Sequence, residues 1–179
     1  MNRMSMKIAV AAFSCAAGLQ AQNILSANAK SGYETVKNNI LKAAEKMPAS
    51  EYSFKPTPDV RSFGELIVHI ADAQTTLCGI ARGEMKRGDA ASKTGKAELI
   101  AAVKTSFDSC DGVYDGMTDT EGKIIVKTPR GEMPKLGLLN VNVAHDNEMY
   151  GIIGVYLRLK GIVPPSTEGA APVDRKSVV

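Results

Sequence analysis

The chain has 179 residues, of which 44% are hydrophobic and 23% charged, a balance typical of one globular domain rather than of a disordered or fibrous chain. The formal net charge is +3, aromatic residues make up 5% and Trp is absent, so we expect no nucleic-acid surface of basic and stacking side chains. The sequence contains no internal repeats, which excludes solenoids and collagen-like rods.

The first segment, residues 1–21, has the layout of a secretory signal peptide. Arg3 and Lys7 form a basic start, an apolar stretch runs from residue 8 to 19, and the small Ala21 precedes polar residues. The apolar stretch is too short to span a bilayer as an anchor. We therefore expect a periplasmic or secreted protein that has no membrane contact after cleavage.

Two alternatives for this segment stay open. One is a buried N-terminal helix, although polar residues do not alternate with the apolar ones as an amphipathic helix requires. The other is a lipoprotein attached through Cys15, although the residues before Cys15 fit a lipid-attachment sequence poorly.

The mature domain, residues 22–165, begins with two predicted helices. The first covers about residues 27–47, where apolar residues recur at helical spacing, and Pro48 ends it. The second starts at a capping box, Ser62-Phe-Gly-Glu65, and ends near Gly83.

Two further helices follow after a polar, glycine-containing loop. The third is predicted over about 96–117 and the fourth over about 136–160. Between them, residues 123–127 predict a short strand, in a hairpin turned at Arg130-Gly131. Residues 166–179 lack apolar periodicity and are expected to be a disordered tail.

Four amphipathic helices predict an all-α four-helix bundle. The loop over residues 83–95 can span up to roughly 43–47 Å. A helix of about twenty residues is roughly 30 Å long. The loop can therefore return along the bundle as a crossover and leave the second and third helices parallel.

Parallel second and third helices would bring Cys78 and Cys110 to nearly the same height. An antiparallel pair would set their Cα atoms beyond the roughly 7 Å limit for bridging. Outside the cytoplasm, an even pair of cysteines favours a disulfide. Two free buried thiols are the alternative.

The chain has only two histidines, and both lie on apolar helix faces. His69 falls on the core stripe of the second helix, and His145 lies in the first half of the fourth. A lone histidine on an apolar face is commonly a hydrogen-bonded core residue. Two histidines pointing into one bundle leave two alternatives open, a metal site or shared polar site on one side and an empty pocket with hydrogen-bonded imidazoles on the other. Asp72 and Glu148, each three residues further along its helix, are nearby carboxylates, and solvated helix faces are their alternative explanation.

Several stretches of the chain resemble the DinB-like superfamily. They are Ser62-Phe-Gly-Glu-Leu-Ile-Val-His-Ile-Ala-Asp72 in the second helix, and His145-Asp-Asn-Glu-Met-Tyr-Gly followed by residues 156–166 around the fourth. The resemblance implies a four-helix bundle with up-down-down-up topology. It also implies a metal site of three histidines, one on the second helix and two spaced His-x-x-x-His on the fourth.

The resemblance carries over to two of the three ligand positions. His69 and His145 match, and Met149 stands where the third histidine is expected. A His/His/Met set should hold Zn or Ni weakly and accept Cu(I), because a thioether is a soft ligand. The candidates for supporting hydrogen bonds to these ligands are Asp72, Asn142, Glu148 and Tyr156.

Three functional classes follow. We favour a secreted bundle that binds a metal ion or small molecule without turnover, because an ion held by two imidazoles and a thioether is a poor generator of hydroxide. The resemblance also implies a metal-dependent hydrolase or thiol transferase, so whether the protein is an enzyme stays open. The third class is a structural relative that has lost the site. A homodimer is a further alternative.

Overall fold

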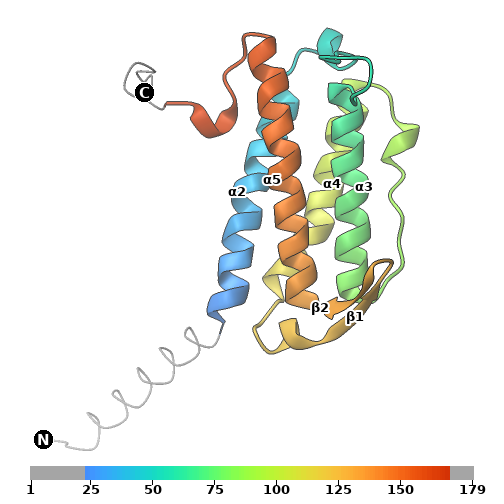
Figure 1. Ribbon diagram of the computed structural model, residues 1–179, viewed down its shortest axis with the longest axis vertical. Helices are drawn as coiled ribbons and strands as arrows, with labels where there is room; N and C mark the ends of the chain where they lie inside the picture. Colours follow the sequence, from blue (N-terminus) through green and yellow to red (C-terminus); the bar gives the residue numbers. More distant parts are fainter. Residues whose placement is uncertain (1–22, 170–179) are drawn as a thin grey trace, which may run out of the picture.

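Four long helices form the framework of the computed structural model, which describes residues 23–169 (Figure 1). The all-α bundle predicted from the sequence is confirmed, and the predicted signal peptide lies outside the described residues. The helices are α2 (Ile24–Lys46), α3 (Phe63–Arg82), α4 (Lys96–Asp115) and α5 (Lys135–Leu159).

The topology is up-down-down-up, as the resemblance implied (Figure 1). Helices α3 and α4 run parallel because the crossover, residues 83–95, returns along the side of the bundle. One short helical turn, η2 (Ala90–Ser92), interrupts it. The backbone N–H of Ala90 donates to the Asp72 carboxylate at 3.0 Å, so a side chain of α3 fastens the crossover to the bundle.

Helix α3 begins and ends as its sequence predicts. The Ser62 hydroxyl accepts from the Glu65 N–H at 3.2 Å, and the Glu65 carboxylate accepts from the Ser62 N–H at 2.6 Å. This capping box satisfies two N–H groups that a helix start leaves without partners. Gly83 ends the helix in a left-handed conformation with φ of 84°, which suits glycine because it has no Cβ.

A small hairpin closes the lower end of the bundle (Figure 1). Its antiparallel strands are β1 (Ile125–Thr128) and β2 (Gly131–Pro134), and the short turn η3 (Glu121–Lys123) precedes it. Thr128 pairs with Gly131, so the turn lies at residues 129–130. The prediction of a hairpin is confirmed, although the first strand starts two residues later than expected and the turn lies one residue earlier than the predicted Arg130-Gly131.

The core consists of side chains from all four helices. Its largest fully buried members include Tyr33, Ile40, Phe63, Ile70, Phe107, Leu139 and Ile153. Three polar side chains are buried just as completely, with 0% of their surface exposed: Gln74, Asn142 and Asp146. Because buried polar groups are costly unless they are hydrogen-bonded, these three residues indicate where the bundle departs from a simple apolar core.

The described structure extends past the predicted domain end at residue 165. A short turn, η4 (Pro165–Thr167), follows, and the Ser166 N–H donates to the Tyr150 hydroxyl at 2.9 Å. Glu168 forms an ion pair with Lys46. Polar contacts of this kind produce no apolar periodicity in a sequence, which is why the sequence predicts a disordered tail here. For residues 166–169 this expectation is corrected. Residues 170–179 lie outside the described residues.

Over residues 23–169, the structure has no helix that combines the length and apolar character needed to cross a membrane.

Candidate functional site

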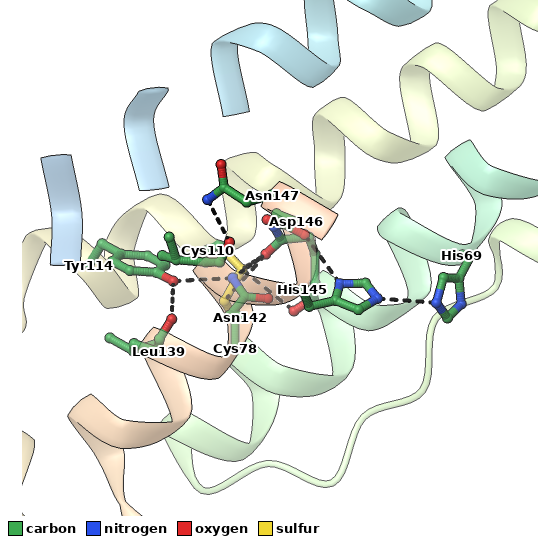
Figure 2. A network of polar contacts seen from close by, with 11 residues as sticks. His69, Cys78, Cys110, Tyr114, Leu139, Asn142, His145, Asp146 and Asn147 are labelled. Atoms are coloured by element: carbon green, nitrogen blue, oxygen red, sulfur yellow. Dashed lines mark hydrogen bonds and ion pairs between the residues drawn. A yellow bond between two sulfur atoms is a disulfide. The ribbon is translucent and has the colours of Figure 1, made fainter. Parts of the chain in front are cut away.

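The two histidines of the chain meet between α3 and α5 (Figure 2). The Nε2 atoms of His69 and His145 lie 3.1 Å apart, and the ring centroids are 5.0 Å apart. Both side chains are half-buried. At this distance one imidazole donates and the other accepts, or both nitrogens face a shared cation.

Asp146 lies behind His145, on the side away from His69 (Figure 2). One carboxylate oxygen lies 3.4 Å from His145 Nδ1, and the other accepts a hydrogen bond from the Gln74 amide. Burial raises the pKa of Asp146, and contact with His145 partly opposes that shift. A carboxylate at this position favours the His145 tautomer that has its proton on Nδ1 and a free lone pair on Nε2.

The polar network continues through the bundle interior to α4. The Asn142 amide donates to Gln74 Oε1 at 2.9 Å and to the Tyr114 hydroxyl at 3.1 Å. Tyr114 in turn donates to the Leu139 carbonyl at 3.0 Å. Within the described part of the chain, Asn142 Oδ1 is the one buried side-chain polar atom without a hydrogen-bond partner. The network joins three helices behind the histidine pair.

The predicted disulfide between Cys78 and Cys110 is present and joins α3 to α4, with Cα atoms 5.5 Å apart. Both cysteines are fully buried. The Gln74 Oε1 atom packs 2.9 Å from Cys110 Sγ, so the disulfide borders the polar network. Gln74 also donates a hydrogen bond to Asp146, which contacts His145. Two side chains, Gln74 and Asp146, therefore connect the disulfide to His145.

The surroundings of His69 favour its neutral form. Burial is the largest cause that lowers the pKa of His69, followed by the charge of Arg61 and the neighbouring His145 ring, whereas Asp72 and Glu148 act in the opposite direction. Neutral imidazole is the form that binds metal ions. The site therefore presents a neutral His69 at neutral pH.

Two cavities border the histidines. One, of about 650 Å³, lies between α3, α5 and the hairpin, and it is lined by both His69 and His145. The other, of about 1020 Å³, lies beside the loop that precedes α3 and is lined by His69 alone of the two. The exposed Glu148 lines the smaller cavity.

Met149, the third ligand predicted from the sequence, is placed in the hydrophobic core with 6% of its surface exposed. It lines neither of the cavities that His69 borders. The structure therefore brings His69 and His145 together and buries Met149, one helical turn from His145, in the core.

The predicted supporting residues have separate roles. Asn142 belongs to the buried network, whereas Asp72 fastens the crossover. The Tyr156 hydroxyl donates to the Arg61 carbonyl at 2.6 Å, which ties α5 to the loop before α3. Within residues 23–169, none of these three side chains forms a hydrogen bond with either histidine.

Sequence reasoning missed Gln74 and Asp146, although both carry a signal. Gln74 lies four residues after Ile70 and four before Cys78, so it interrupts the apolar face of α3. Asp146 follows His145 directly in a helix that is apolar over much of its circumference. A polar residue at a core-facing position requires a partner, and here the two residues are partners of each other.

The histidine pair fits a metal ion in part. Two nitrogens bound to one tetrahedral zinc at 2.0–2.1 Å lie about 3.3 Å apart, close to the separation seen here. The carboxylate behind His145 supplies the outer hydrogen bond that metal-binding histidines commonly make. Residues 23–169, however, contain no group of three or more His, Cys, Asp or Glu side chains arranged so that they could hold a metal ion. The residues fit a two-imidazole site and not a three-histidine one.

A family model described as the DinB superfamily matches residues 33–153. The chain belongs to the DinB superfamily. It is similar to the crystal structure of a DinB-like protein from Bacillus subtilis (21% identity, TM-score 0.62, covering 75% of this chain and 92% of that one). A DinB-like protein from Bacillus cereus is also similar (17% identity, TM-score 0.68, covering 80% and 97%).

A third similar structure is a point mutant of mycothiol-dependent maleylpyruvate isomerase (12% identity, TM-score 0.59, covering 69% of this chain and 60% of that one). At these identities the likeness to all three structures concerns the fold of the DinB superfamily alone. No curated protein matches the sequence.

Proposed function

We propose that this DinB-superfamily protein binds a divalent transition-metal ion or a small ligand between His69 and His145, and that it does so without turnover. The observation that carries the proposal is the 3.1 Å separation of the two Nε2 atoms, with the buried Asp146 behind one of them. Two neutral imidazoles directed at one point offer two lone pairs to one ion. The remaining coordination positions would be open to water or to a ligand.

Binding is favoured over turnover because of the number of ligands. Catalytic zinc sites commonly use three protein ligands and a water molecule. With Met149 in the core, this chain offers one imidazole fewer than the superfamily pattern. We expect Zn(II) and Ni(II) to bind with a Kd weaker than about 1 μM. Cu(I) is the alternative ion, because it accepts imidazole and thioether donors.

Calorimetric titration of Zn(II) and Ni(II) tests the site. We expect His69→Ala to weaken zinc binding at least tenfold, about 1.4 kcal/mol. Asn147→Ala, an exposed position on α5 next to the site, is the matched control and should bind as the wild type does. Equal zinc affinity in His69→Ala and the control would show that the histidine pair is not the site.

Two substitutions at Met149 test the third position. Met149→His should leave Zn(II) and Ni(II) binding within about twofold, because residue 149 is buried in the core and lines neither cavity that His69 borders. A gain of at least tenfold, about 1.4 kcal/mol, would instead show that position 149 can supply the third imidazole of the superfamily pattern. Met149→Leu should leave Zn(II) and anaerobic Cu(I) binding within about twofold, because Met149 packs in the core. A tenfold loss of Cu(I) affinity in Met149→Leu would instead make Met149 a ligand.

We also propose that the protein is exported. The basic and apolar order of residues 1–21 supports this, and the Cys78–Cys110 disulfide is compatible with an oxidising compartment. N-terminal sequencing of protein recovered outside the cytoplasm should find a start close to residue 22. Recovered protein that begins at Met1 would contradict the export signal.

A further inference from the structure

The cavity that both histidines line combines apolar side chains with the two imidazoles, the carboxylates of Asp72 and Glu148, and Arg130. Its volume of about 650 Å³ lies within the range of small-molecule sites. Leu77, Leu138, Val141 and Met133 contribute apolar surface from α3, α5 and the hairpin. Such a cavity suits a ligand with a hydrocarbon body.

The hairpin adds one cation, Arg130, to the lining of this cavity. Arg130 is exposed, and none of the ion pairs found among residues 23–169 involves its guanidinium. The Thr128 hydroxyl accepts from the Arg130 N–H at 3.2 Å and donates to the Gly131 carbonyl at 2.8 Å. These two hydrogen bonds fix the backbone of the turn. They therefore fix the Cα position from which the Arg130 side chain extends to the cavity.

We infer that this cavity binds a small monocarboxylate with an apolar body, whose carboxylate pairs with Arg130 and whose hydrocarbon part lies against Leu77, Leu138 and Val141. A planar guanidinium matches a carboxylate with two parallel hydrogen bonds, and the apolar wall removes hydrocarbon surface from water. The inference rests on the proposed function in one respect, because it treats the histidine pair as the inner end of the same cavity.

Charge selectivity is the first test, made by calorimetry on the full chain with a chelator present so that metal ions play no part. The probes are 4-phenylbutyrate and 4-phenylbutan-1-ol, which share one hydrocarbon body. The wild type should bind the carboxylate at least tenfold more tightly than the alcohol. Arg130→Gln should remove most of this difference by weakening carboxylate binding, while alcohol binding stays within about twofold.

Lys127→Gln is the matched control for charge, because Lys127 is an exposed cation on the same hairpin and does not line this cavity. It should bind both probes as the wild type does. Equal losses in Arg130→Gln and Lys127→Gln would overturn the inference, because general attraction would then explain the preference. Equal binding of the two probes by the wild type, or no binding of either, would overturn it as well.

Filling the cavity is the second test. Ala144 is exposed on α5 and lines the cavity, so Ala144→Trp should weaken both probes at least tenfold. Asn140→Trp, at an exposed α5 position outside the lining, should leave both unchanged. Undiminished binding in Ala144→Trp would place the probes elsewhere and refute the inference.

The two proposals fail independently. Arg130→Gln should bind Zn(II) as the wild type does, and His69→Ala should keep its carboxylate binding within about threefold. Loss of charge selectivity with intact zinc binding would refute the carboxylate site alone. If His69→Ala binds zinc as the wild type does, and the preference for the carboxylate over the alcohol still depends on Arg130, the metal site alone is refuted.

Discussion

The Nε2 atoms of His69 and His145 lie 3.1 Å apart, so the two rings can share a single proton between them, or a single cation can contact both from beside the line that joins them. If both rings carried an extra proton, two N–H groups would face each other across this gap. The pair is therefore built for neutral imidazoles, and burial of His69 reinforces this by lowering its pKa. The arrangement should be sensitive to pH near the ordinary range of histidine.

The first prediction concerns stability against pH. Because the pKa of His69 is lowered in the folded protein, the unfolded chain binds more protons as the pH falls below about 6.5. The free energy of unfolding should therefore decrease from about pH 7 to about pH 5.5, and His69→Gln should decrease less over the same interval. Urea unfolding at both pH values measures the difference. Parallel behaviour of the wild type and His69→Gln would contradict the prediction.

The second prediction concerns the disulfide. The double substitution Cys78→Ala and Cys110→Ala should lower the free energy of unfolding by about 3–4 kcal/mol, because it opens a loop with a sequence separation of 32 residues. Urea unfolding measures the loss. Thiol titration of unreduced, denatured wild type is the control and should find no reactive thiol from this pair. Two free thiols would contradict the disulfide.

The third prediction separates Asp146 from the ligands themselves. Asp146→Asn should weaken Zn(II) binding by about 10–100-fold, because the carboxylate that orients His145 is lost. Asp108→Asn, at an exposed position on α4, is the matched control and should bind zinc as the wild type does. Calorimetry measures both, and near-ultraviolet dichroism checks the packing. A well-packed Asp146→Asn protein with wild-type affinity would show that Asp146 has no part in orienting His145.

The fourth prediction compares two glycines. A Cβ at Gly88 would overlap the Asp72 carboxylate oxygen that fastens the crossover, whereas a Cβ at Gly112 in α4 would meet nothing within 4 Å. Gly88→Ala should lower the free energy of unfolding by about 1–3 kcal/mol. Gly112→Ala should raise it by about 0.5–1 kcal/mol, because alanine suits a helix interior better. Thermal or urea unfolding of both variants decides whether the crossover packs this closely.

The sequence by itself determined the helices and their order. Local signals were sufficient there: apolar residues at helical spacing, the capping box at Ser62 and Glu65, and Gly83 as a helix end. Loop length and helix length together predicted the parallel α3 and α4, and with them the Cys78–Cys110 pairing. These features follow from short-range periodicity and chain geometry.

Only the tertiary structure decided which polar side chains meet in the interior. Gln74 and Asp146 are 72 residues apart in the chain, and nothing local marks them as partners. Helical spacing places Met149 one turn from His145, but the rotation of α5 against its neighbours turns Met149 into the core and leaves Glu148 at the cavity. That rotation results from the packing of all four helices at once, because a helix with apolar residues over much of its circumference does not specify which side faces inward.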